Sequence, residues 1–126
     1  MTLEQVMEKY PTLGSFGFGI FSYRNKSNEE IAEELRQKRL NLMQSAERVE
    51  AARLWISRFV KLKNINKTGS SYGLKHVAER EIGYITNGEL IAAALMEGFN
   101  VQIEGPNGYF NISQKAWQTK LQAIFG

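Results

Sequence analysis

Apolar residues recur at helical spacing along the segment that follows Ser27. Successive members are three, four or seven residues apart and so fall on one face of a helix; they are Ile31, Leu35, Leu42, Ala46, Val49, Ala52, Ile56 and Val60. No glycine or proline interrupts the stretch. We therefore predict a single long helix over residues 28–62, with a break near Asn41 or Ser45 as the alternative.

The length of this predicted helix bears on the oligomeric state. A helix of residues 28–62 would be about 50 Å long, whereas a compact domain of this size is roughly 35 Å across. One end would then project beyond the domain. Because a projecting apolar stripe is normally covered by a partner chain, we expect a homodimer through the long helix.

Three capping boxes mark the starts of helices, and one of them starts the long helix. In each, a Ser or Thr precedes a Glu or Gln by three residues, and the pairs are Thr2 with Gln5, Ser27 with Glu30, and Thr86 with Glu89. The first box predicts a short helix that Pro11 ends. The third predicts a helix from Asn87 to Glu97, closed by Gly98, whose apolar interior indicates burial.

One more helix is expected between the long helix and the one that starts at Asn87. Ser70 or Ser71 can cap its beginning, and Gly83 follows its end near Glu81. Gly83 and the capping box after it would join this helix to the next one as a pair.

Two segments have the character of extended chain. Residues 14–23 alternate small and aromatic residues, which predicts a loop or short strand that lays Phe16, Phe18 and Phe21 on the core. Near the C-terminus, Gly105-Pro106-Asn107-Gly108 separates two short alternating runs and predicts one β-hairpin. Ser113 is expected to cap a last helix, which contains Trp117, Leu121, Ile124 and Phe125.

Together these elements predict a mainly α (α+β) single domain over residues 1–126, a length typical of one domain. Its expected parts are an N-terminal helix and aromatic-rich extended segment (1–26), the long helix (28–62), a helix pair (70–98), a β-hairpin (100–112) and a C-terminal helix (113–126).

Composition narrows the possible chemistry. The chain has no cysteine, and all 13 of its acidic residues are glutamates, which excludes disulfides, thiolate catalysis and Asp-based calcium loops. No apolar run is long enough to cross a bilayer, and Glu4 and Glu8 stand where a signal peptide would be basic or apolar. We expect a cytoplasmic protein without cofactor or metal and without a membrane partner.

Positive charge gathers in the middle of the chain. No acidic residue lies between Ala51 and Ala78, and this stretch carries six cations: Arg53, Arg58, Lys61, Lys63, Lys67 and Lys75. With Tyr72 nearby, the pattern suits a surface that contacts phosphates. Basic residues near the end of a helix also complement its dipole, which accounts for Lys61 and Lys63 without any ligand.

Catalysis has weak support in the sequence. His76 is the only histidine, and the nearby candidates for a relay are Ser70 or Ser71 and Glu79. Residues so close together on one helix do not easily point at a common reacting atom. A half-buried or surface role for His76 is the better interpretation, and we expect no enzyme.

Residues 70–111 carry a resemblance to a known group of proteins. The motifs are Ser-Ser-Tyr-Gly-Leu-Lys-His-Val-Ala-Glu, Gly-Tyr-Ile-Thr-Asn-Gly-Glu-Leu-Ile-Ala-Ala-Ala-Leu, Gly-Phe and Gly-Pro-Asn-Gly-Tyr-Phe-Asn. They resemble small uncharacterised bacterial proteins of phages, plasmids and integrative elements. The resemblance implies a bacterial or mobile-element context and assigns no site residues.

Two functions remain open at this point. The first is a noncatalytic binding protein that contacts nucleic acid, or a complex bound to nucleic acid, through the six basic residues. The second is a protein-interaction module of a phage or mobile element, such as an inhibitor of a host defence or regulatory complex.

Overall fold

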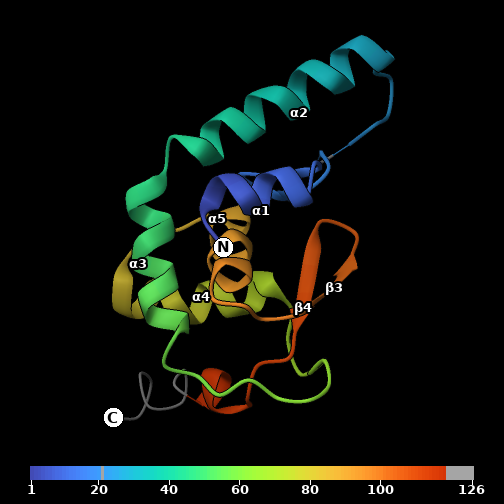
Figure 1. The fold of residues 1–126 in the computed structure, drawn as a ribbon. Coiled ribbons are helices and arrows are strands. Elements are labelled where there is room, and N and C mark those ends of the chain that lie inside the picture. The colour runs from blue at the N-terminus through green and yellow to red at the C-terminus, as the bar shows by residue number, and fades with distance from the viewer. Residues whose placement is uncertain (21, 119–126) are drawn as a thin grey trace.

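The computed structural model describes residues 1–20 and 22–118 and is mainly helical with two small antiparallel hairpins (Figure 1). In chain order the elements are α1 (Leu3–Lys9), β1 (Leu13–Gly14), β2 (Gly17–Phe18), α2 (Asn28–Met43), α3 (Ala46–Ile56), α4 (Ser71–Ile82), α5 (Asn87–Met96), β3 (Val101–Glu104) and β4 (Asn107–Phe110). The expected mainly α architecture is confirmed.

The prediction of one long helix over residues 28–62 was wrong. The helix stops at Met43, and a new helix, α3, begins at Ala46 and runs at a clear angle to α2 (Figure 1). At the break, Ser45 donates both its N–H and its hydroxyl to the Leu42 carbonyl. Such local bonds from serine compete with the helix ladder, and the alternative break near Ser45 is the one observed.

The end of α3 also comes earlier than expected. The helix ends at Ile56, where the Ser57 hydroxyl donates to the Leu54 carbonyl at 2.7 Å. The chain turns at residues 57–59, and beyond this turn Leu62 N–H donates to the Asn111 carbonyl. Because α2 holds only 16 residues, or about 24 Å, the length argument for a homodimer no longer applies.

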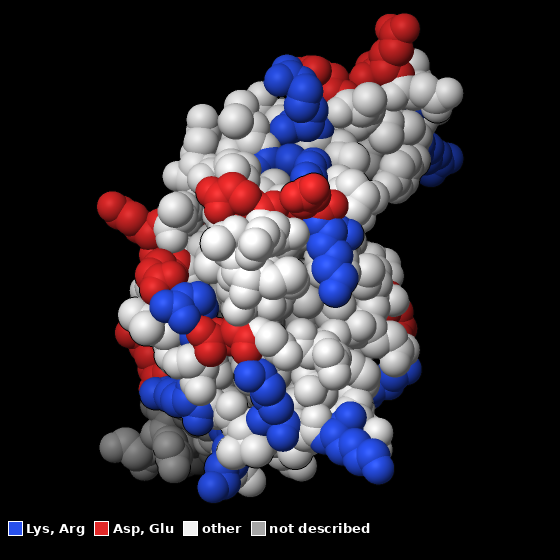
Figure 2. All heavy atoms as spheres, viewed as in Figure 1, with Lys and Arg blue, Asp and Glu red and all other residues white. Residues whose placement is uncertain are grey.

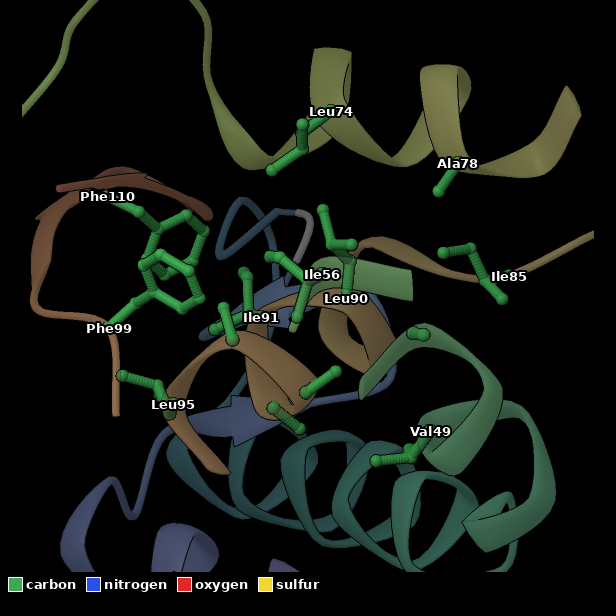
Figure 3. Packing of buried hydrophobic residues seen from close by; sticks show 14 of the residues in the cluster. Val49, Ile56, Leu74, Ala78, Ile85, Leu90, Ile91, Leu95, Phe99 and Phe110 are labelled. Atoms are coloured by element: carbon green, nitrogen blue, oxygen red, sulfur yellow. The ribbon is translucent and has the colours of Figure 1, made fainter. Parts of the chain in front are cut away.

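Helix α5 is the centre of the core, as its apolar sequence predicted. Every residue from Asn87 to Leu95 is buried, and α1, α3 and α4 all pack against it. Figure 3 shows Leu90, Ile91 and Leu95 of α5 among apolar side chains from the surrounding elements. The three expected capping boxes are all formed, at Thr2, Ser27 and Thr86.

The N-terminal aromatic segment folds as a tight hairpin, β1–β2, which lies against the start of α5. Phe18 is buried, as predicted. Phe16 was expected on the core, but it occupies the two-residue turn between the strands and is exposed. The expectation for Phe21 concerns a residue outside the described ranges.

Helix α1 is fastened to α2 by one arginine. The Arg39 guanidinium donates to the carbonyls of Met7, Tyr10 and Leu13 at 2.8 to 3.0 Å. Burial lowers the pKa of this group from its ordinary value. Arg39 thereby binds carbonyls at the end of α1, which lack partners within the helix, together with the Leu13 carbonyl of β1.

The C-terminal hairpin forms where the sequence placed it, with Glu104 opposite Asn107 across a Gly105-Pro106 turn. The start of a last helix is described at residues 115–118. Trp117 packs there on Gly69, whereas Leu121, Ile124 and Phe125 lie outside the described residues. Within the described ranges, no helix has the length and apolar character required to cross a bilayer.

Candidate ligand-binding pocket

Three of the six cations of the basic segment are neutralised by glutamates. Arg53 binds Glu50 and Glu97, Arg58 binds Glu81 at 2.5 Å, and Lys75 binds Glu79 at 2.9 Å. The hydrogen bonds that Arg53 donates to Glu50 and Glu97 raise its pKa. Burial of Glu81 alone would raise its pKa, but hydrogen bonds from Arg58 and Trp55 outweigh that effect and lower it.

The other three cations, Lys61, Lys63 and Lys67, lie in the connection between α3 and α4, where all three are exposed. Lys61 stands over the Phe99 ring and Lys67 over the Tyr109 ring. On the face drawn in Figure 2, Lys and Arg side chains form separate patches, several of them next to glutamates. The structure therefore does not bring the six residues together as one free cationic surface.

His76 lies on the exposed side of α4. Its ring packs edge-on against Tyr72 with the ring centres 4.6 Å apart, and its Nδ1 is 3.1 Å from Glu79. Ser71 is fully buried, and its hydroxyl accepts a hydrogen bond from Gly108 N–H. The serine therefore faces the interior and does not complete a relay with His76.

A pocket of about 520 Å³ opens where the two hairpins meet the starts of α4 and α5. Its walls come from the β1–β2 hairpin, from Lys38 of α2, from Tyr72 and Lys75 of α4, and from Tyr84 in the α4–α5 connection. The β3–β4 turn closes the remaining side. The size and the mostly apolar walls with a few polar groups are typical of ligand sites.

Three exposed aromatic side chains form the rim of this pocket. Phe16, Tyr72 and Tyr84 are 55%, 53% and 62% exposed. Large apolar side chains gathered at a concave surface are typical of binding sites, whereas single exposed ones are ordinary. The rim therefore makes this pocket a candidate binding site.

Each aromatic side chain of the rim has a cation beside it. The Lys38 ammonium lies 3.9 Å from the centre of the Phe16 ring. Lys75 lies between Tyr72 and Tyr84, at 5.4 and 5.6 Å from their ring centres. Lys75 is 8% exposed and paired, whereas Lys38 makes no ion pair among the described residues and is half-buried.

Asn87, the first residue of α5, lies at the base of the pocket. Its side-chain Nδ2 donates to Asn107 Oδ1 at 2.9 Å and lies within hydrogen-bond distance of the Phe16 and Pro106 carbonyls. Its Oδ1 is buried and has no hydrogen-bond partner in the described part of the chain. The amide is therefore held through its nitrogen, and its oxygen is closed off from solvent.

A buried carboxylate lies next to the pocket. Glu89 is 1% exposed, and one of its oxygens accepts from Thr86 N–H in the capping box. Its other oxygen is 2.9 Å from the Arg48 guanidinium, which also stands over the Tyr84 ring. This ion pair joins α3 to the start of α5, and it fixes the wall of the pocket that carries Tyr84.

The sequence pointed to part of this site. Tyr72 and Lys75 stood out as an aromatic and a cation within the acid-free stretch, and the structure places both in the pocket. Phe16, Lys38 and Tyr84 were missed because the fold gathers them from three distant segments. The polar start of the otherwise apolar α5, at Asn87, was the one local signal available.

Comparison with protein-family models, curated proteins and solved structures finds no match for this chain. The resemblance of residues 70–111 to proteins of mobile elements therefore stays a prediction. Across the described residues, no three His, Cys, Asp or Glu side chains are grouped so that they could hold a metal ion.

Proposed function

We propose that this protein is a noncatalytic binding protein for single-stranded nucleic acid, and that the aromatic pocket holds one of the bases. The observation that carries the proposal is the rim, where three exposed aromatic side chains each lie beside a cation. Bases stack on aromatic side chains whatever the sequence, and nearby cations attract the phosphates between them.

The charge balance of the pocket favours an anionic ligand. The walls of the pocket and of the adjoining hollow contain three cations. Arg48 and Lys75 are paired with Glu89 and Glu79, and Lys38 has no carboxylate partner among the described residues. The chain as a whole has a net charge of +3. A ligand that joins a flat ring to a negative group matches both the rings and the cations.

A single strand fits this pocket better than a duplex. The bases of a duplex are stacked and paired inside it, so a base reaches a pocket only after an energetic cost of unpairing. A single strand already presents its bases. The proposed contact therefore uses aromatic rings and a smaller set of cations in place of the six basic residues predicted from the sequence.

The test compares two sets of variants in a binding titration with a fluorescent ten-nucleotide strand and its duplex. Replacing both Tyr72 and Tyr84 by Ala should weaken binding of the strand by at least about tenfold, since stacking contributes about 1–3 kcal/mol per base. Both side chains are exposed, so their loss should leave the circular dichroism spectrum unchanged.

The matched control replaces Lys61, Lys63 and Lys67 by Gln, which removes exposed cations away from the pocket. This variant should keep most of the affinity for the strand. Binding that depends on the three lysines and ignores the tyrosines would refute the proposal, and so would a duplex that binds as tightly as the strand.

A further inference from the structure

A second hollow adjoins the aromatic pocket. It has a volume of about 370 Å³ and shares three lining residues with the pocket, namely Phe16, Tyr84 and Thr86. Tyr84 has a cation from each side beside its ring, Lys75 of the pocket at 5.6 Å and Arg48 of the hollow at 5.4 Å. A chain-like ligand in the pocket can therefore continue past Tyr84 into the hollow.

The lining of the hollow differs from that of the pocket. Apart from two aromatic side chains of the rim, its walls consist of polar and charged side chains. Asn41, Gln44 and Arg48 are exposed there, and each carries N–H donors. The Asn41 side-chain oxygen accepts from Gln37, whereas the Gln44 amide makes no hydrogen bond within the described residues. The hollow therefore offers several open donors.

Arg48 adds donors to the hollow without adding net charge. Its Nη2 lies 2.9 Å from Glu89 Oε2, but its side chain is 48% exposed. A guanidinium carries five N–H donors in one plane, so those that do not face Glu89 stay open to a ligand. Because Glu89 is 1% exposed, a ligand in the hollow meets the guanidinium and not the carboxylate.

We propose that the hollow binds the sugar-phosphate of the nucleotide next to the stacked one, and that it thereby fixes the direction of the strand. This inference rests on the proposed function, since it assumes that a base occupies the pocket. Arg, Asn and Gln side chains commonly bind phosphate and sugar oxygens of DNA, and such contacts set its orientation on a protein. Only one of the two neighbours of the stacked nucleotide can occupy the hollow, because the hollow adjoins the pocket at one end.

The experiment compares two isomeric strands that differ only in direction. Each has ten sugar-phosphate units, nine of them abasic, and carries a single thymine at its 5′ end or at its 3′ end. From the thymine, the first strand continues only in the 3′ direction and the second only in the 5′ direction. Both have the same phosphate charge, so the general attraction to a protein of net charge +3 is matched.

One of the two strands should bind at least about fivefold more tightly than the other, since a single hydrogen bond contributes roughly this factor. Equal affinity of the two strands, both above that of a fully abasic strand, would overturn the inference and leave the proposed function intact. If neither thymine strand binds better than the abasic strand, the proposed function itself fails.

A pair of variants tests whether the difference arises in the hollow. Replacing Asn41 and Gln44 by Ala removes two amides from its wall, and both side chains are exposed, so the fold should persist. The tighter strand should lose affinity, and the weaker strand should keep its own because it does not reach the hollow. Gln102→Ala is the matched control, since Gln102 is an exposed amide of β3 outside both the pocket and the hollow. A directional preference as large in the double variant as in the native protein would contradict the inference.

Discussion

Gly88 lies so close to the Gly14 carbonyl that it has no room for a side chain, and Gly14 in turn lies against Lys38. A Cβ on Gly88 would lie 1.8 Å from the Gly14 carbonyl oxygen, and a Cβ on Gly14 would lie 2.8 Å from the Cβ of Lys38. The β1 backbone is therefore held between α2 and the start of α5. This contact positions the β1–β2 turn, which carries Phe16 at the pocket rim.

Gly88→Ala should destabilise the protein through this contact. Overpacking of a core contact costs about 1–3 kcal/mol and sometimes more, and here the obstacle is backbone that cannot turn aside. The measurement is the free energy of unfolding in urea. Gly73→Ala is the matched control, because a Cβ at Gly73 in α4 meets nothing within 4 Å, and it should stabilise by about 0.5–1 kcal/mol.

Arg39 and Arg36 lie one turn apart on α2 and should differ sharply in their effect on stability. Arg39→Met removes three hydrogen bonds, although the Tyr10 carbonyl keeps that from Leu13 N–H. Hydrogen bonds to charged groups contribute about 1.5–3 kcal/mol each. Arg36 makes an exposed pair with Glu33, so Arg36→Met should change little. Equal losses in urea unfolding would contradict this assignment.

Sequence patterns predicted the elements whose signals are local. Thr2, Ser27 and Thr86 mark helix starts because a capping box is complete within four residues. Turn chemistry at Gly105 and Pro106 predicted the hairpin for the same reason. The break at Ser45 does not show in the apolar spacing, because the apolar stripe keeps the same helical phase from α2 into α3. The two helices nevertheless pack on different neighbours.

The pocket depends on contacts between distant segments, which explains why the sequence showed little of it. Phe16 and Lys38 reach the pocket only because β1 packs against α2. The acid-free segment looked cationic for a related reason. Its partners, among them Glu81 and Glu97, lie outside the segment and approach Arg58 and Arg53 only after folding.

The ion pair between Arg58 and Glu81 should make stability fall in acid. Burial alone would raise the pKa of Glu81, but hydrogen bonds from Arg58 and Trp55 lower it below its ordinary value. A carboxyl with a lowered pKa adds stability above its unfolded pKa, and that stability is lost as the pH falls through its folded pKa. The relevant window therefore lies below about pH 4.5.

Urea unfolding at pH 7 and pH 3 tests this dependence with Glu81→Gln. The variant should be less stable than the native protein at pH 7, and the difference should shrink at pH 3, because a falling pH favours protonation of the native carboxyl. Glu104→Gln is the control, since Glu104 is exposed and makes no ion pair within the described residues. A difference that stays constant with pH would contradict the pairing.

Lys38 offers the sharpest electrostatic test of the proposed site. It is half-buried at the pocket wall, it stands over the Phe16 ring, and no carboxylate of the described residues pairs with it. A cation that neutralises one phosphate of a single strand adds about 0.7 to the slope of log K against log salt. Lys38→Gln should lower that slope by this amount while preserving the contact of its Cβ with Gly14.

Lys63→Gln should leave the slope unchanged, because Lys63 lies outside the pocket. If both variants lower the slope by the same amount, the strand binds through the general surface charge and not through the pocket.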